Sequence, residues 1–172
     1  PVDFSPPMLA AARDRFAEAQ SPVRLLDRDL SQADWTNGLV VSTPFDVVVS
    51  GYAIHHLPDK RKRAVYADVF DLLAPGGVFI TMDHVASASD RLERMFNQNM
   101  VDALTEFRRR ERPDLLRDVV EAEYVNRPDQ HDNILASVEV QCEWLRVIGF
   151  HEVDCFCKWF ELALFGGFKP AA

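Results

Sequence analysis

Short apolar runs alternate with longer amphipathic stretches along the first half of the chain. Residues 23–26, 45–50 and 78–82 are short and apolar, whereas residues 60–73 repeat apolar positions every three to four residues. The first pattern is typical of strands and the second of a helix packed on a sheet. The run Val47-Val48-Val49 has no polar position, so we expect a parallel strand buried on both faces. This order predicts an α/β fold with right-handed crossovers.

Two helical regions follow in the second half. Residues 88–127 predict two polar helices, and apolar spacing marks one face of the first, made of Leu92, Phe96, Ala103 and Phe107. Residues 134–148 predict a further helix that Gly149 ends.

Two adjacent strands are predicted at the end of the chain, over residues 150–159 and 161–168. Alternation places Val153, Cys155 and Cys157 on one side of the first of them. A closing strand pair favours an antiparallel edge on an otherwise parallel sheet.

Composition narrows the class of protein. With 172 residues, 48% of them hydrophobic and 27% charged, the chain fits one globular domain. A net charge of −8 disfavours duplex nucleic acid as the main partner, without excluding a local basic patch. Three cysteines without a Cys-x-x-Cys motif indicate a reducing, cytoplasmic setting. No apolar stretch is long enough to span a bilayer, so no membrane partner is expected.

Polar residues follow the predicted strand ends, where ligands bind in open α/β sheets. Ser50-Gly51 ends one strand, the pair His55-His56 follows it, and Asp83-His84 ends the next strand. We expect Ser50 and Gly51 to line a ligand mouth, because glycine permits close approach of a ligand to the backbone. His56 and His84 are the candidate catalytic bases. One histidine of the pair could instead only pack between helix and sheet.

A metal site is not expected, because the histidines and Asp83 lack a recognised ligand spacing.

Four segments in order and spacing carry a family resemblance. They are VDFSPPML at residues 2–9, the segment 45–59, LLAPGGVFI at residues 72–80, and GFHEVD at residues 149–154. Together they resemble the class I S-adenosylmethionine-dependent methyltransferases, from the end of the second family strand to the carboxyl terminus. The resemblance implies a Rossmann-like, mostly parallel sheet with an antiparallel C-terminal strand. It also implies a helical insertion after the fifth family strand.

The resemblance implies S-adenosyl-L-methionine as cofactor and assigns its contacts. Asp3 would bind the ribose hydroxyls, Phe4 and Met8 would pack on the adenine, and Asp29-Leu30 would lie near the adenine amino group. Ser50 and Gly51 would line the methyl-transfer mouth. In the alternative interpretations, Asp3 is a surface residue that only interacts favourably with the dipole of the following helix, Met8 belongs to the core, and Asp29 is a solvated loop residue. That helix is predicted to start at Ser5-Pro6-Pro7, with the Ser5 side chain as its cap.

The glycine-rich loop of the family would lie upstream of Val2. We therefore expect residues 1–172 to form one N-terminally incomplete methyltransferase domain. Residues 88–133 would be a helical insertion that covers the substrate pocket. The alternatives for this insertion are a hairpin packed away from the pocket or a contact within a homodimer.

Three functions are consistent with these residues. The first is methyl transfer to a small-molecule acceptor. The second resembles the tRNA wobble-uridine carboxymethyl-transferases, which use a carboxylated cofactor; Arg127 is available as the cation, and tRNA stays open as a partner. The third is a non-catalytic methyltransferase-like binding protein.

Overall fold

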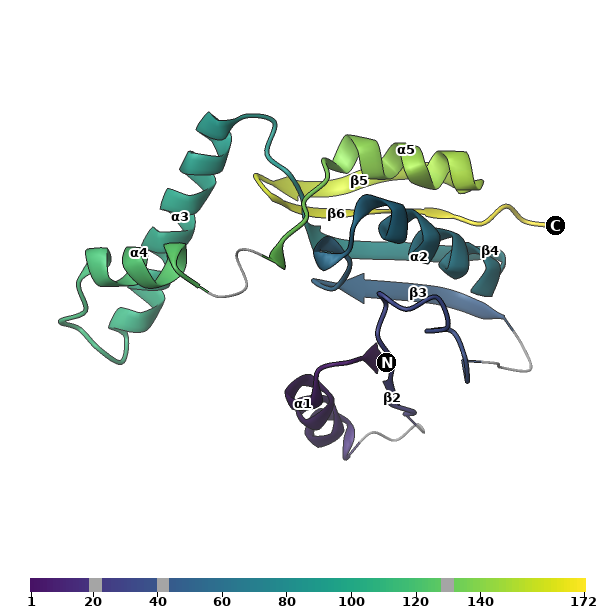
Figure 1. Ribbon diagram of the computed structural model, residues 1–172, viewed down its shortest axis with the longest axis horizontal. Coiled ribbons are helices and arrows are strands. Elements are labelled where there is room, and N and C mark those ends of the chain that lie inside the picture. Colours follow the sequence, from purple (N-terminus) through teal and green to yellow (C-terminus); the bar gives the residue numbers. More distant parts are fainter. Residues whose placement is uncertain (19–22, 40–43, 128–131) are drawn as a thin grey trace. The chain divides into compact units, whose positions relative to one another are not determined.

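The computed structural model describes residues 1–18, 23–39, 44–127 and 132–172 (Figure 1). The chain divides into two compact units, Pro1–Pro44 and Phe45–Ala172, and each is described by itself. In the first unit, β1 (Val2–Asp3) and β2 (Leu26–Asp27) pair in parallel, and α1 (Pro6–Phe16) follows β1. This is one strand–helix–strand crossover.

The start of α1 differs from the expected serine cap. Ser5 is extended, and its side chain makes no cap hydrogen bond. Its backbone N–H instead donates to Asp3 Oδ1 at 2.8 Å. The carboxylate of Asp3 therefore shapes the turn that leads into the helix.

The second unit is built on a four-stranded sheet. Its strands are β3 (Phe45–Gly51), β4 (Leu73–His84), β5 (His151–Trp159) and β6 (Leu162–Phe168), in the order β3-β4-β6-β5. β3 and β4 are parallel, and β6 runs antiparallel to both of its neighbours. The expected α/β fold with an antiparallel C-terminal strand is confirmed.

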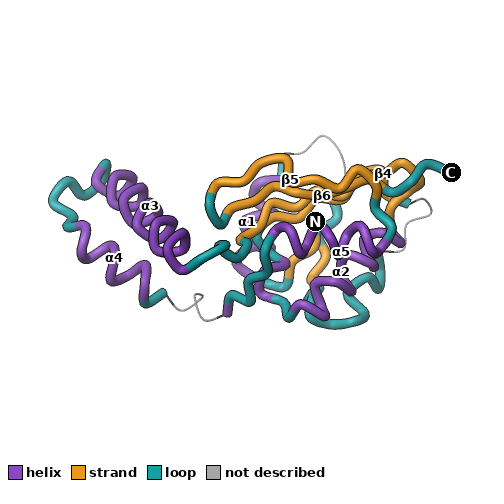
Figure 2. Tube along the Cα trace, turned by 90° about the horizontal axis from the view of Figure 1, so that it is seen from above, coloured by secondary structure: helices purple, strands orange, loops and turns teal. Residues whose placement is uncertain are grey.

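Two helices cover one face of this sheet. The short η1 (Ile54–His56) leads into α2 (Asp59–Leu72), and α5 (Val138–Ile148) packs beside α2. Figure 2 shows α2 and α5 on the same side of the strands. Aromatic rings join the layers: the ring centroids of Tyr66 and Phe79 are 5.6 Å apart, and those of Phe70 and Phe150 are 4.9 Å apart.

The expectation that β3 is buried on both faces is wrong. Val47 and Val49 are 55% and 72% exposed. Their partners in the parallel ladder are Val78 and Ile80, so they lie on the sheet face opposite to Phe79. The helices α2 and α5 cover the Phe79 face, and alternation therefore leaves every second residue of β3 outside that core.

The helices α3 (Asp90–Arg109) and α4 (Arg117–Val125) form a hairpin with a small core of its own, made of Val101, Leu115 and Val120. The predicted apolar face of α3 is wrong in part, because Ala103 and Phe107 are exposed while Phe96 is buried. Thr105 takes an inward position instead. Its hydroxyl donates to the Val101 carbonyl at 2.7 Å, which satisfies the buried oxygen.

The last helix starts later than expected. α5 begins at Val138, because the hydroxyl of Ser137 caps it by accepting from the Val140 N–H at 3.3 Å. Ile134 lies before the helix and is held by other groups: its N–H donates to the His55 carbonyl at 3.0 Å, and its carbonyl accepts from Lys62 Nζ. Gly149 ends the helix with a φ of +119°, as expected.

The expectation that Val153, Cys155 and Cys157 share one side of β5 is also wrong. Cys155 pairs with Phe165 and Cys157 with Leu164, so Phe156 is an extra residue in a β-bulge. The bulge turns Cys157 to the other face, where it is exposed.

Among the described residues, no helix combines the length and apolar content that crossing a membrane requires.

Candidate functional site

In the first unit, two acidic segments leave the small sheet at the same edge. β1 and β2 are parallel, with Asp3 paired to Asp27, so the carboxyl ends of both strands point the same way. Asp3 ends β1, and Asp29 follows β2 by two residues. Asp29 accepts from Ser31 N at 2.8 Å and from Ser31 Oγ at 2.7 Å. Two of the residues that the resemblance implied for an adenosine group are therefore neighbours in the fold.

The other three residues implied for the adenosine also lie in this unit. Phe4 and Met8 are 64% and 58% exposed, so their apolar surfaces are available to a planar ligand. Leu30 is half-buried next to Asp29. An exposed Met8 contradicts the alternative that it belongs to the core.

In the second unit, a cavity of about 370 Å³ lies at the carboxyl ends of β3 and β4. Its wall combines imidazole rings, phenol rings and apolar side chains. The wall includes Tyr52, His55, His56, His84, Phe96 and Arg127. Ser50 is half-buried and Gly51 exposed in β3, and neither is among the lining residues of this cavity. Tyr52, immediately after β3, lines it instead.

The paired histidines have different environments. His55 is buried, and its Nδ1 lies 2.5 Å from Asp83 Oδ1. Asp83 is itself buried and also accepts from the backbone N–H groups of Ile54, at 3.1 Å, and His84, at 3.0 Å. His55 is therefore the histidine that packs between η1 and the sheet, and Asp83 connects the end of β4 to η1.

His56 is the exposed member of the pair. Its Nδ1 lies 3.3 Å from the Asp132 carbonyl oxygen, and its ring centroid is 3.8 Å from that of His55. A carbonyl can only accept, so Nδ1 carries the proton and the lone pair of neutral His56 is on Nε2. That arrangement suits a group that accepts a proton from a ligand.

His84, the last residue of β4, has a carboxylate partner that sequence reasoning missed. Its Nε2 lies 2.7 Å from Glu161 Oε2, and Ser87 Oγ donates to Glu161 Oε1 at 2.6 Å. Glu161 lies between β5 and β6, where an acid is normally solvated, so no local signal marked it. The cavity thus carries two imidazole–carboxylate pairs, His55–Asp83 and His84–Glu161.

A buried phenol lies between α2 and α5. The hydroxyl of Tyr66 donates to Gln141 Oε1 at 2.6 Å, which ties α2 to α5. Burial, and then the negative charge of Asp83, raise the pKa of Tyr66 well above its usual value. Tyr66 therefore stays neutral at physiological pH and acts as a donor.

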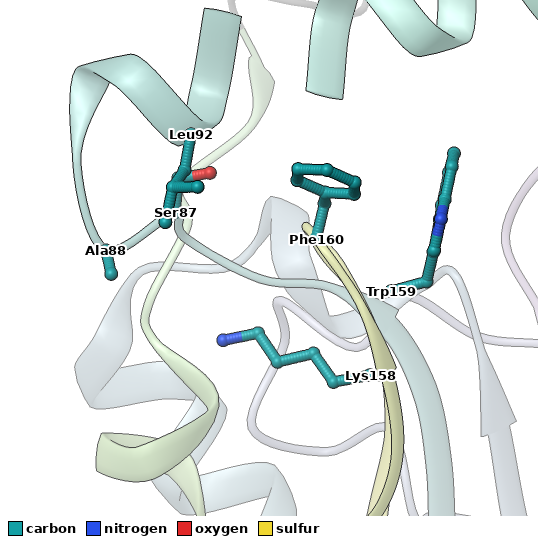
Figure 3. Close-up of a pocket in the computed structure, with 6 residues that line it drawn as sticks. All are labelled: Ser87, Ala88, Leu92, Lys158, Trp159 and Phe160. Atoms are coloured by element: carbon teal, nitrogen blue, oxygen red, sulfur yellow. The ribbon is translucent and has the colours of Figure 1, made fainter. Parts of the chain in front are cut away.

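A second cavity, of about 420 Å³, lies beside the β5–β6 turn (Figure 3). Its wall includes Ser87, Leu92, Trp159 and Phe160. The Nζ of Lys158, which also lines it, is 3.6 Å from Glu139 Oε1. This cavity has fewer groups able to exchange protons than the first. Among the described residues, no group of three or more metal-ligating side chains gathers at either cavity.

Comparisons with known proteins find a matching family model, relatives in sequence and solved structures with a similar fold. A family model described as a methyltransferase domain matches residues 2–79. An uncharacterized methyltransferase of Mycobacterium tuberculosis (strain ATCC 25618 / H37Rv) is 36% identical over 84 residues, which cover 49% of this chain and 38% of that protein. A carboxy-S-adenosyl-L-methionine synthase of Desulforapulum autotrophicum is 23% identical over 171 residues, which cover 98% of this chain and 63% of that protein. The chain thus spans less than two thirds of the length of each of these two relatives.

A solved structure repeats the fold. The N-methyltransferase NodS from Bradyrhizobium japonicum WM9, in complex with S-adenosyl-L-homocysteine, matches with a TM-score of 0.56 at 17% identity, over 98% of this chain and 65% of that one. These matches support a class I S-adenosylmethionine-dependent methyltransferase. For a methyltransferase of this class, the cavity at the ends of β3 and β4 lies at the sheet edge where ligands bind.

Proposed function

We propose that this methyltransferase transfers the methyl group of S-adenosyl-L-methionine to a small-molecule acceptor bound in the cavity at the ends of β3 and β4. The observation that carries the proposal is the set of three imidazoles on the cavity wall, two of them held by buried carboxylates. The cofactor supplies a methyl group on a positively charged sulfur, which leaves as a neutral thioether when the acceptor atom takes the methyl.

The residues of the chain would align the acceptor, exclude water and remove its proton. His56 and His84 are the proposed bases, because each lines the cavity and each has one ring nitrogen engaged by an oxygen of the protein. A base is needed when the acceptor is a hydroxyl or an amine, since the atom that gains a methyl group must lose a proton.

The cofactor fits the residues of the first unit. Asp3 and Asp29 leave parallel strands at the same edge, and a carboxylate at a strand end is the group that binds ribose hydroxyls in dinucleotide folds. We propose that Asp3 binds the ribose, that Asp29 and Leu30 lie at the adenine, and that Phe4 and Met8 pack on its ring. Ser50 and Gly51 are proposed at the mouth.

We also propose that residues 1–172 act as one methyltransferase domain and that residues 88–133 form its cover. Phe96 and Met100 of α3, with Tyr124 of α4, line the same cavity as His56 and His84, which supports this role. Closing the cavity with apolar side chains would exclude water from the reacting groups.

The test is cofactor binding by calorimetry with the full-length protein. Asp3→Ala should weaken the affinity for S-adenosyl-L-methionine by about 1.5–3 kcal/mol, the range for hydrogen bonds to a charged group. Asp14→Ala removes the same charge from the exposed surface of α1 and should leave the affinity unchanged. Equal affinities of wild type and Asp3→Ala would refute the ribose assignment. No binding by the wild type would favour a non-catalytic protein.

A second candidate is a methyltransferase-like enzyme that acts on tRNA with a carboxylated cofactor. Arg127 favours it, since its guanidinium lines the cavity and lies 4.0 Å from the centre of the Tyr124 ring, with Nη1 donating to the Tyr124 carbonyl at 2.6 Å. The likeness to a carboxy-S-adenosyl-L-methionine synthase points the same way. Mass spectrometry of the ligand that copurifies with the protein separates the two candidates, because the carboxylated cofactor is heavier.

A further inference from the structure

The turn between β5 and β6 places a buried acid against the proposed base. Glu161 is only 4% exposed, although it lies in a hairpin turn. Burying a carboxylate is costly unless both oxygens have partners. Its Oε2 lies 2.7 Å from His84 Nε2, and its Oε1 accepts from Ser87 Oγ at 2.6 Å. Both oxygens of Glu161 are therefore occupied by polar groups of β4 and the segment after it.

The backbone fixes the position of this acid. The Val85 N–H donates to the Glu161 carbonyl at 2.8 Å, and the next pair in the antiparallel ladder is His84 with Leu162. Phe160 precedes the acid with a φ of +51°, a left-handed conformation that makes the turn tight. The ladder thus delivers the side chain of Glu161 to the ring of His84, independently of any ligand.

This contact determines the tautomer of His84. A carboxylate accepts hydrogen bonds and donates none, so Nε2 of His84 carries a proton. In the neutral ring the lone pair is then on Nδ1. The imidazolium that forms when Nδ1 takes a proton keeps its Nε2–H bond to the carboxylate, and the negative charge offsets the positive one.

We propose that Glu161 is a positioning residue for methyl transfer: it holds His84 as the Nε2–H tautomer, so that Nδ1 is the atom that removes the acceptor's proton. Ser87 assists by fixing the second oxygen of Glu161. The inference rests on the proposed function and goes beyond it, because it assigns the proton to one nitrogen and gives the β5–β6 turn a part in the reaction. The proton moves from the acceptor atom to Nδ1, and no other bond of the protein changes.

Other titratable groups lie around the His84–Glu161 pair, and their signals must be distinguished from those of His84. The ring centroid of His55, which is bonded to Asp83, lies 5.8 Å from that of His84, on the η1 side. The α3 side presents the uncharged ring of Phe96, also at 5.8 Å. The remaining polar groups of the cavity wall are Tyr52, His56, Tyr124, Arg127 and Asn133. A bulk titration would therefore mix three imidazoles, so the test must observe His84 alone.

The first arm of the test is nuclear magnetic resonance on the full-length protein labelled with ¹⁵N-histidine. The His84 signals are assigned by their loss in His84→Gln. At pH 8 the wild type should show the Nε2–H pattern for His84, and Glu161→Gln should replace it with a mixture of tautomers. Ser87→Ala should shift it in the same direction by a smaller amount. Glu143→Gln removes the same charge from an exposed position of α5 and should change nothing.

A wild-type His84 in the Nδ1–H form would overturn the proposal, even if Glu161→Gln failed to fold. An unchanged tautomer in a folded Glu161→Gln protein would overturn it as well.

The second arm measures turnover, as S-adenosyl-L-homocysteine formed from S-adenosyl-L-methionine with a panel of phenols and amines. Glu161→Gln should lower kcat at least ten-fold with little change in KM for the acceptor, which is a part of the roughly 100- to 10,000-fold that general-base catalysis contributes. An unchanged kcat in a folded Glu161→Gln protein would overturn the proposal. A wild type that forms no product while His84 shows the expected tautomer would instead count against the proposed function.

Discussion

Replacing Asp83 tests how the cavity is held together. Asp83 is 1% exposed and accepts three hydrogen bonds, from the Ile54 N–H at 3.1 Å, from His55 Nδ1 at 2.5 Å and from the His84 N–H at 3.0 Å. One carboxylate thus joins the end of β4 to the histidines before α2. Asp83→Asn keeps the shape of the side chain but replaces one acceptor oxygen with a donor, which leaves at least one buried donor without a partner.

The expected loss in the free energy of unfolding follows from these contacts. Each buried donor that loses its acceptor costs about 1–3 kcal/mol, and bonds to a charged group are at the upper end. Asp83→Asn should therefore lower the free energy of unfolding by about 2–4 kcal/mol. Asp83→Ala removes all three acceptor contacts and should cost about 3–5 kcal/mol, since each buried donor left without an acceptor costs about 1–3 kcal/mol.

Urea unfolding of the full-length protein at pH 7, followed by circular dichroism, measures these differences. The matched control is Asp102→Asn, which makes the same chemical change in an exposed ion pair, where Asp102 Oδ1 lies 2.7 Å from Arg117 Nε. The control should cost no more than about 1 kcal/mol. If Asp83→Asn cost the same as Asp102→Asn, the carboxylate would not be what anchors η1 to the sheet.

Two further predictions concern a glycine and a thiol. Gly166→Ala should destabilise the protein by about 3 kcal/mol or more in the same unfolding assay, because the new Cβ would lie 2.0 Å from the Phe79 carbonyl oxygen. A cost below about 1 kcal/mol would contradict the close approach of β6 to β4. Burial raises the pKa of the Cys142 thiol to about 11, whereas an unfolded thiol titrates near 9, so the folded state should lose stability as the pH rises from about 9 to 11. Unfolding free energies measured between pH 8 and 11 check this, and Cys142→Ala should remove that part of the pH dependence; an equal slope in wild type and Cys142→Ala would contradict it.

Local sequence patterns predicted an element well where one of its faces is buried in the core and the other is exposed to solvent. The helix at α2, the closing strand pair and the helix end at Gly149 all follow from period and from terminal residues. The predictions failed where a tertiary contact changed the local rule. A hydroxyl bonded within its own helix let Thr105 point inward, and a bulge at Phe156 reversed the side of Cys157.

The sequence by itself determined the order of strands and helices and the residues at the strand ends, because apolar period and terminal residues are local properties of the chain. His84 was identified in this way, since a polar residue at the carboxyl end of a strand lies at the sheet edge where ligands bind. Only the tertiary structure decided which polar groups meet. His55 and Asp83 are 28 residues apart, and His84 and Glu161 are 77 residues apart. Such pairs depend on the register of the strands and on which side of a turn is buried, and both result from packing across the sheet rather than from the residues next to each histidine.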